Sequence, residues 1–369
     1  MINGNVPGNV TGNVTSNFNR NVTGTFSERR AEQISTIKDI AKKLGVSVST
    51  VSRALNNHPD IREETKKQVM EMIKKLNYMP NAMAKGLIQK KSYTIGLMIP
   101  EITDPFFSGI AHGVEEELSN HNYQCVYGNT GRDSKKEKNF ISSAISRQYD
   151  GLILTPDHMD EEFISMLANI SIPYVFLRRR TPEQLPMPFV DVDHYESACT
   201  AVRHLIEAGH RQIGLIGMSE TSFVGQLRYQ GYVDTLRANG IELEDKNVVL
   251  GGNRIEFGRE AMGRLLEANP TITAVFAVND LLGIGALEYL AEQQIAVPDQ
   301  ISLIGFDDLE YSRLHWIQLT TMKQPRKEMG RRAAQLVLNM IENKDEIPPS
   351  VLFDTQLLQR KTVGRLESL

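Results

Sequence analysis

Five side chains that can form hydrogen bonds lie close together near the N-terminal end of the chain: Ser47, Ser49, Thr50, Ser52 and Arg53. Short hydroxyl side chains bond to phosphate oxygens and base edges, and an arginine can donate two parallel hydrogen bonds to a guanine or a phosphate. The chemistry open to this group is therefore non-covalent recognition of a polyanion. The alternative is a solvated polar surface, because exposed serines are common on small helical bundles.

The charge of the chain is divided unevenly, which favours a polyanion as the partner. The 369 residues carry a net charge of −4, but residues 35–91 hold twelve Lys/Arg against five Asp/Glu, which is +7. Residues 1–34 carry +1, so residues 92–369 carry −12. A basic head on an acidic body suits a head that binds a polyanion and a body that the polyanion repels. A merely solvated basic surface is the alternative.

Three short helices are predicted to position these five side chains. The first begins at Thr36, which forms a capping-box-like pair with Asp39, and ends at Gly45. A three-residue turn leads to a second helix at about residues 48–56, and a third spans about residues 63–76. Two short helices joined by a glycine-containing turn predict a helix-turn-helix, whose second helix fits the major groove of DNA. The side chains left on its outer surface are those of Val48, Ser49, Ser52 and Arg53.

Residues 1–34 repeat an Asn-Val-(Thr/Pro)-Gly pattern, which predicts a disordered tail or reflects the choice of start site. The chain has no run of about 18 uncharged apolar residues and no signal-peptide pattern, so we expect no membrane span, no export and a cytoplasmic location. Cys125 and Cys199 lie far apart without Cys or His at ligand spacing. We therefore expect two buried thiols and no disulfide, metal or cofactor.

From residue 93 onward, apolar runs alternate with helical segments, which is typical of parallel sheets with crossover helices. About 275 residues exceed what one such core holds, so two α/β lobes with a cleft between them are expected. Catalysis is not expected, because the dinucleotide, phosphate-loop and nucleophile-elbow patterns are absent and the eight histidines form no cluster at ligand spacing. The predicted strands are Thr94–Ile99, Gln124–Tyr127, Gly151–Leu154, Tyr174–Leu177, Ile213–Ile216, Ala274–Ala277 and Ser302–Gly305.

Four segments of the head resemble the lactose/galactose repressor (LacI/GalR) family of bacterial transcription regulators. They are Thr36-Ile37-Lys38-Asp39-Ile40-Ala41, Gly45-Val46-Ser47, Thr50-Val51-Ser52-Arg53-Ala54-Leu55-Asn56 and Leu76-Asn77-Tyr78-Met79-Pro80-Asn81. The resemblance continues to about Gly364. It implies an all-α helix-turn-helix head plus a two-lobed α/β core like a periplasmic binding protein, with two parallel sheets flanked by helices.

The resemblance also implies which residues bind DNA. Val48, Ser49 and Arg53 take the base-reading positions, and residues 81–87 match a hinge helix whose Leu87 enters the minor groove, unless Leu87 is only an apolar linker residue. Gly86 lowers helix propensity by about 1 kcal/mol, so this hinge is expected to fold only on DNA. The residues expected to bind DNA are Thr36, Ser47, Val48, Ser49, Thr50, Ser52, Arg53, Asn56, Asn81, Ala84, Lys85 and Leu87.

The same resemblance divides the chain and places a ligand. It implies a head at residues 35–80, a hinge at 81–91 and a core at 92–369, with lobe 1 at about 92–192 and 324–352 and lobe 2 at about 193–323 and 353–369. Crossovers are expected near Asp193, Gln324 and Phe353. The residues expected to bind an effector are Phe106, Phe107, Arg178, Arg179, Arg228, Asn279, Asp307 and Gln324. Each could instead be a core, surface or hinge residue.

Two positions depart from the family pattern. Leu177-Arg178-Arg179 stands where many members have Ile-Asp-Arg, and Asn253 stands where relatives often have an aromatic residue. An added cation in the cleft suggests an anionic effector such as a sugar acid or phosphosugar, because arginine binds carboxylate and phosphate bidentately. Alternatively, Arg178 turns outward into solvent with Arg180.

The sequence therefore predicts a DNA-binding regulator. The family resemblance implies that it represses carbohydrate-utilisation genes and lies in the cytoplasm, associated with the nucleoid. Its expected partners are near-palindromic operator DNA, a small sugar or sugar-acid effector and a second copy of the chain. A homodimer is favoured because the chain ends without a leucine-heptad tail. Two alternatives remain: a catabolite-control regulator gated by a phosphocarrier protein, and a sugar-binding protein without a regulatory role.

Overall fold

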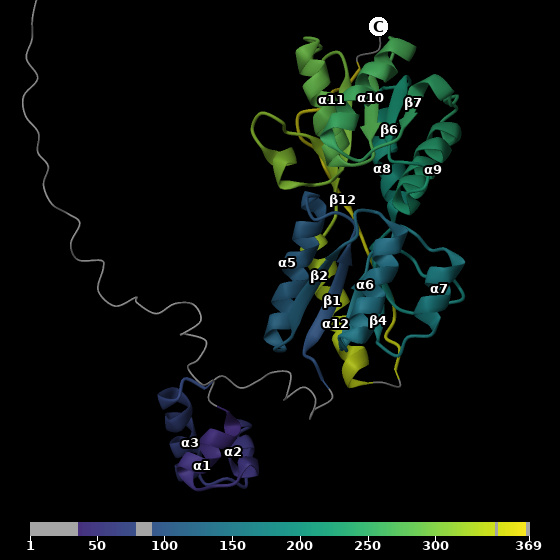
Figure 1. The fold of residues 1–369 in the computed structure, drawn as a ribbon. Coiled ribbons are helices and arrows are strands. Elements are labelled where there is room, and N and C mark those ends of the chain that lie inside the picture. Colours follow the sequence, from purple (N-terminus) through teal and green to yellow (C-terminus); the bar gives the residue numbers. More distant parts are fainter. Residues whose placement is uncertain (1–35, 79–90, 344–345, 367–369) are drawn as a thin grey trace, which may run out of the picture. The chain divides into compact units, whose positions relative to one another are not determined.

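The computed structural model describes residues 36–78, 91–343 and 346–366, which form two compact units (Figure 1). We call residues 36–78 the head and residues 91–366 the core. The expected tail at residues 1–34 and the hinge residues Asn81, Ala84, Lys85 and Leu87 lie outside the described residues. No helix in the described part of the chain is long and apolar enough to cross a bilayer.

The head consists of three helices, α1 (Ile37–Leu44), α2 (Val48–Leu55) and α3 (Glu63–Lys75). The predicted capping box is present, because the Thr36 hydroxyl accepts from the backbone N–H of Asp39 and the Asp39 carboxylate accepts from that of Thr36. Gly45 ends α1 in the left-handed conformation at φ 67°, which glycine adopts without strain. The helix-turn-helix is therefore confirmed, with α2 and α3 each one residue shorter than predicted.

The core of the head is small and joins all three helices. Ile40 of α1, Val51 of α2 and Val69 of α3 are fully buried, together with the nearly buried Ala41 and Ala54. Val51 and Ala54 lie three residues apart and so face the same side of α2. Their burial leaves the opposite side of this helix exposed.

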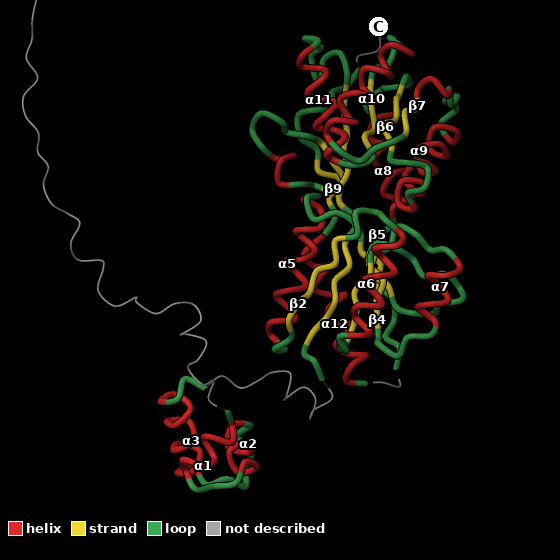
Figure 2. The backbone as a smooth tube through the Cα atoms, in the orientation of Figure 1, coloured by secondary structure: helices red, strands yellow, loops and turns green. Residues whose placement is uncertain are grey.

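The core has two lobes, each built on a six-stranded sheet (Figure 2). The lobe 1 sheet has the order β11-β5-β4-β3-β1-β2 and is parallel throughout. Its strands are β1 (Thr94–Ile99), β2 (Gln124–Asn129), β3 (Gly151–Leu154), β4 (Tyr174–Leu177), β5 (Phe189–Val192) and β11 (Val351–Phe353). Its helices are α5 (Pro105–Asn120), α6 (Ser134–Ser146), α7 (Glu161–Ala168) and α12 (Arg326–Glu342).

The lobe 2 sheet has the order β12-β10-β9-β8-β6-β7 and is parallel except for its edge strand β12, which runs antiparallel to β10. Its strands are β6 (Ile213–Gly217), β7 (Val248–Leu250), β8 (Ala274–Ala277), β9 (Ser302–Asp307), β10 (Thr320–Lys323) and β12 (Gln356–Leu358). Its helical segments are α8 (His194–Glu207), α9 (Phe223–Ala238), α10 (Ile255–Ala268), α11 (Asp280–Glu292) and the 3₁₀ turns η1 (Asp245–Asn247) and η2 (Glu310–Arg313).

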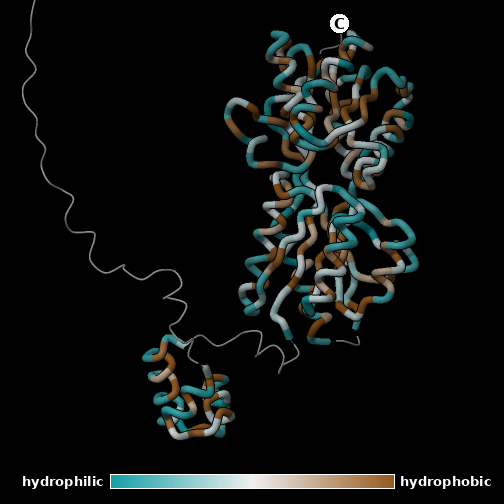
Figure 3. The backbone as a smooth tube through the Cα atoms, viewed as in Figure 1, coloured by the Kyte–Doolittle hydropathy of each residue, from teal (hydrophilic) through white to brown (hydrophobic). Residues whose placement is uncertain are grey.

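The strands are apolar because helices cover both sides of each sheet. β3, β4, β6, β8 and β9 are buried at every position, and the apolar segments in Figure 3 run through the interior of both lobes. All seven predicted strands are present. The five that were not predicted lack a continuous apolar run of four residues: β7, β11 and β12 have only three residues, and polar residues interrupt β5 and β10.

The chain passes between the lobes three times: between β5 and α8, between β10 and α12, and between β11 and β12. These passages bring the carboxyl ends of strands from both sheets to the junction of the lobes, where ligands of open α/β sheets bind. One side-chain prediction needs correction, because Cys125 is only half-buried while Cys199 is buried. Cys125 lies on β2, the edge strand of lobe 1, where one neighbouring strand is missing.

We predict that Gly113→Ala destabilises lobe 1, because α5 and α12 pack closely at this glycine. A Cβ at position 113 would lie 1.9 Å from the backbone oxygen of Lys327, so α12 would have to move. The expected loss in the free energy of unfolding is about 2–3 kcal/mol, measured by denaturant titration. Gly109→Ala in the same helix is the matched control, since its Cβ would meet only the Arg326 side chain at 3.3 Å. Equal stability of the two variants would contradict this packing.

Candidate functional site

The exposed side of α2 carries the predicted DNA-binding residues of the head. Val48, Ser49, Arg53 and Asn56 are exposed, and Ser52 is half-buried. These positions follow one another at helical spacing, so they share one side of the helix, opposite Val51 and Ala54. Val48 is 42% exposed, so its methyl groups are accessible for apolar contact.

Several hydroxyl groups of the head also stabilise the helices that carry them. Ser47 caps α2 by accepting from the backbone N–H of Thr50 at 3.0 Å, and its Oγ lies 2.6 Å from that of Ser49 and 2.8 Å from Oγ1 of Thr50. The Asn56 amide donates to the backbone oxygen of Ser52 at 3.0 Å. Thr36 is likewise used in its capping box. Val48 and Arg53 have no such bond among the described residues, so their side chains are the freest to reach a base.

The junction of the two lobes holds a cluster of buried polar groups centred on Arg228 of α9. Its guanidinium is fully buried, donates to the backbone oxygen of Val278 and lies 3.6 Å from Oδ1 of Asp307. The Phe306 ring packs against it, with its centroid 3.6 Å from Cζ. Burial lowers the pKa of Arg228 to about 10, partly opposed by Asp307, so it remains charged at neutral pH. Its Nε has no hydrogen-bond partner among the described residues.

Asp307 ends β9 and faces both Arg228 and Gln324. It adopts φ 128°, a backbone conformation that directs the side chain into the junction, and accepts from Nε2 of Gln324 at 2.6 Å. Burial raises the pKa of Asp307 to about 7, although Arg228 opposes this shift. Oε1 of Gln324 is buried without a partner in the described part of the chain. These two groups can therefore both donate to and accept from a polar ligand.

His194 and Asp191 complete this cluster and were not predicted. Nε2 of His194 lies 3.0 Å from Oδ1 of Asp191, and Nδ1 lies 3.3 Å from Nη2 of Arg228. Burial lowers the pKa of His194 to about 4, so the ring is neutral at neutral pH. Because Arg228 can only donate, Nδ1 accepts and the proton stays on Nε2, facing Asp191. The pair thus holds the guanidinium of Arg228 from the β5–α8 side.

Phe106 and Phe107 belong to the core of lobe 1, and the guanidinium of Arg178 packs against both rings. Both rings are almost fully buried and pack edge to face, 5.4 Å apart. Cζ of Arg178 lies 4.5 Å from the Phe106 centroid and 5.2 Å from that of Phe107. Arg178 therefore turns into the cleft, whereas Arg180 is exposed and pairs with Asp193 at 3.3 Å. The outward alternative for Arg178 is wrong.

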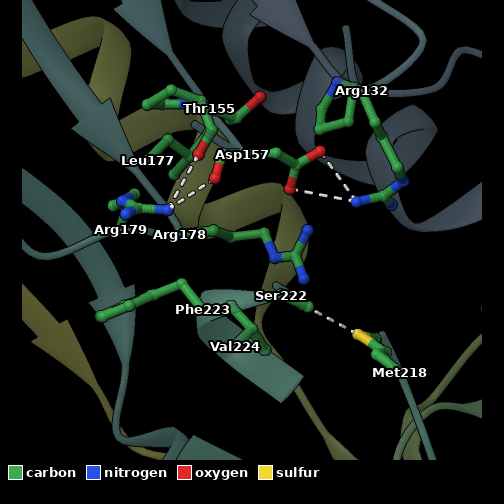
Figure 4. Close-up of a pocket in the computed structure, with 12 residues that line it drawn as sticks. Arg132, Thr155, Asp157, Leu177, Arg178, Arg179, Met218, Ser222, Phe223 and Val224 are labelled. Carbon is green, nitrogen blue, oxygen red and sulfur yellow. Dashed lines mark hydrogen bonds and ion pairs between the residues drawn. The ribbon is translucent and has the colours of Figure 1, made fainter. Parts of the chain in front are cut away.

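A pocket lies beside this cluster and is lined from both lobes (Figure 4). Arg179 donates to the backbone oxygen of Asp157 at 3.1 Å and stacks on Phe223 at 4.8 Å. Arg132 pairs with the Asp157 carboxylate at 2.9 Å. The lining residues are Pro100, Arg132, Thr155, Pro156, Asp157, Leu177, Arg178, Arg179, Met218, Ser222, Phe223 and Val224.

Unlike the other predicted effector residues, Asn279 uses both polar atoms of its side chain in hydrogen bonds to the backbone of lobe 2. Its Oδ1 caps α11 by accepting from the backbone N–H of Leu282 at 2.7 Å, and its Nδ2 donates to the backbone oxygen of Asn253 at 3.1 Å. The neighbouring Asp280 is fully buried and accepts from Ser312, Thr321 and the backbone of Leu309. This segment joins α11 to the rest of lobe 2.

Some residues of the cluster and the pocket were not predicted, and they differ in whether the sequence contained a pattern that indicates their position. Arg132 and Asp157 follow strands that were predicted, so their places at strand ends were readable. His194 follows β5, which was not predicted. Phe223 and Ser222 begin α9 in a stretch without any distinctive motif, so only the fold brings them to the pocket.

Comparison with known families agrees with this two-part construction. Residues 36–81 match the model of bacterial regulatory proteins of the lacI family, and residues 92–361 match the model of periplasmic binding proteins and sugar-binding domains of the LacI family. The chain belongs to the LacI family of bacterial regulatory proteins. This LacI-family chain is thus a DNA-binding transcription regulator with a sugar-binding type of core.

Relatives of known role are similar along almost their full length. The transcriptional repressor CytR of Escherichia coli strain K12 is 34% identical over 338 residues, 92% of this chain and 99% of that protein. Catabolite control protein A of Priestia megaterium is 31% identical over 318 residues, covering 86% of this chain and 95% of that protein. The crystal structure of the lac repressor dimer bound to operator and the anti-inducer ONPF has a TM-score of 0.81 and 26% identity, covering 89% of this chain and 99% of that one.

We predict that Asp307→Asn changes how stability depends on pH. Because burial raises the pKa of Asp307 to about 7 from an ordinary 3.8, the folded protein binds this proton more tightly than the unfolded chain. This contribution is fully present below the unfolded pKa and is lost as the pH rises through 7.

Between about pH 5 and pH 8, wild type should therefore lose roughly 2–3 kcal/mol relative to Asp307→Asn. Denaturant unfolding of both proteins at each pH measures the difference. Asp299→Asn, which removes an exposed carboxylate from the same lobe, is the control. A wild type that gains stability over Asp307→Asn with rising pH would refute the sign.

Proposed function

We propose that this regulator represses transcription as a homodimer on a near-palindromic operator, and that a small polar effector in the cleft controls its affinity for DNA. The observation that carries the proposal is a group of buried polar atoms at the junction of the lobes without a hydrogen-bond partner in the described structure, among them Nε of Arg178, Nε of Arg228 and Oε1 of Gln324. Buried polar groups are normally satisfied, and a bound hydroxylated ligand would satisfy these.

The proposed effector site consists of the residues predicted for it, extended by the pocket. Arg228, Asp307 and Gln324 supply donors and acceptors for hydroxyl groups, Phe223 supplies apolar surface, and Phe106 and Phe107 support Arg178. Relatives support this class of ligand: the regulator CelR, 30% identical with a TM-score of 0.68, was solved as a complex with cellobiose. Carbohydrate-utilisation genes are accordingly the proposed targets.

Contacts between the lobes are the proposed place where the effector acts on the core. Arg254 of lobe 2 pairs with Glu101 of lobe 1 at 2.8 Å. Arg326 donates to the backbone oxygens of Pro105 at 3.1 Å and Asp308 at 2.9 Å, one from each lobe. A ligand that binds both lobes changes the free energy of these contacts and hence the relative population of lobe arrangements. A coupling of about 1–3 kcal/mol would alter operator affinity roughly 5–150-fold.

The exposed side of α2 is the proposed base-reading surface, and residues 81–91 are the proposed hinge, with Asn81, Ala84, Lys85 and Leu87 as DNA contacts. In support, the relative CytR is named a transcriptional repressor, and the lac repressor was solved as an operator-bound dimer. Two copies would present two α2 helices to successive major grooves, and half-sites of one sequence then follow from the symmetry.

We predict that Arg53→Ala weakens operator binding by about 1–3 kcal/mol and relaxes preference at one base pair, because Arg53 is exposed on α2 and can bond bidentately to guanine. Fluorescence anisotropy with operator DNA, selected from random sequences by the wild type, measures this. The variant should keep its thermal stability.

Arg53→Lys is the matched control. A lysine keeps the positive charge but cannot form two parallel hydrogen bonds. It should therefore restore operator affinity if Arg53 contacts a phosphate, and not if Arg53 contacts a guanine. Uniform loss over all sequences with rescue by lysine would assign Arg53 to phosphate. If the wild type selects no sequence at all, the proposed function is wrong.

A further inference from the structure

Arg178 differs from every other arginine at the junction of the lobes in the partners of its side chain. Within the described residues, Arg132 pairs with Asp157, Arg179 donates to the backbone oxygen of Asp157, and Arg228 faces Asp307. The Arg178 guanidinium forms no hydrogen bond or ion pair with the described part of the chain, and its Nε is buried. Its only partners there are the rings of Phe106 and Phe107.

We propose that the effector is an anion, and that its carboxylate or phosphate binds the guanidinium of Arg178. This inference rests on the proposed function and names the chemical class of the ligand. An arginine that is partly removed from water and lacks a carboxylate partner loses hydration without compensation. An oxyanion of the ligand compensates for that loss with two parallel, charge-assisted hydrogen bonds, which a neutral hydroxyl group does not offer.

The side chain of Arg178 is held ready for such a ligand. Residue 178 directly follows β4 in a left-handed backbone conformation at φ 58°, an uncommon one for an arginine, and its backbone N–H donates to Val190 at 2.9 Å. Below it, the two phenylalanine rings support the guanidinium by cation–π contact. In Figure 4 the side chain extends across the pocket toward Asp157 and Ser222. It therefore reaches the ligand space and not the solvent.

The nearby carboxylates do not take the place of a ligand anion. Asp191 and Asp307 feel the charge of Arg178, but each has a closer partner, His194 for Asp191 and Arg228 for Asp307. Both carboxylate oxygens of Asp157 accept from Nη1 of Arg132, at 3.0 and 2.9 Å. The cluster around Arg228 can bind ligand hydroxyls while Arg178 binds the charged end. A sugar acid or a sugar phosphate has both parts.

Titration calorimetry with the full-length protein tests the class of ligand. The probes are glucuronate, galacturonate and glucose 6-phosphate, each compared with glucose or galactose. We expect at least one anion to bind at least about tenfold more tightly than its neutral counterpart, and this binding to weaken as salt is raised. If a uronate binds most tightly, the charged group of the effector is a carboxylate; if glucose 6-phosphate binds most tightly, it is a phosphate. Tighter binding of a neutral sugar, or no binding of any anion at millimolar concentration, overturns the inference.

Two variants locate the effect. Arg178→Gln should lower the affinity for the anion about tenfold or more relative to its effect on the neutral sugar, whereas Arg178→Asp should reverse the preference. Arg180→Gln is the matched control, because it removes a neighbouring but exposed arginine. If Arg178→Gln binds the anion as wild type does, the assignment is wrong.

Operator binding separates this inference from the proposed function. The ligand-free wild type and the control Arg180→Gln should bind the selected operator with equal affinity, because neither the head nor the effector site differs between them. If operator binding responds only to neutral sugars, the proposed function stands and the anionic effector is refuted. If no ligand and no operator binds the wild-type protein, the proposed function itself fails.

Discussion

The guanidinium of Arg228 is a positive charge buried entirely within protein, and such a charge is stable only where fixed partners replace its water. Its partners come from both sides of the lobe junction: Asp307 at the end of β9, His194 after β5 and the ring of Phe306. Each partner is in turn held by another group, Asp307 by Gln324 and His194 by Asp191. The two lobes are thereby joined through one polar network, and anything that enters this network affects both.

In the proposed mechanism, this network connects effector binding in the core with DNA binding by the head. Arg228 and Asp307 belong to lobe 2, whereas Asp191 and Arg178 belong to lobe 1, and Gln324 lies where the chain returns from one lobe to the other. A ligand that supplies the missing hydrogen bonds stabilises one arrangement of the lobes over others. The head needs no ligand chemistry of its own, because its small apolar core and capped helices already present the outer side of α2.

Prediction from the sequence was most successful where structure depends on near neighbours. Thr36, Asp39 and Gly45 define the ends of α1 through bonds that span only a few residues, so the helix-turn-helix was readable from the chain. The long apolar strands were readable for the same reason. β5 and β10 were missed because polar residues interrupt their apolar runs, and β12 was missed because it has only three residues.

The sequence by itself determined the division of the chain into a basic helical head and an acidic α/β core, because charge and apolar periodicity are local properties. It also placed an extra arginine at position 178. Only the tertiary structure decided that Arg178 turns onto Phe106 and Phe107, that His194 and Asp191 hold Arg228, and that Asn279 caps α11. These contacts join residues that are distant in the chain, and the direction of a side chain depends on what the fold brings beside it.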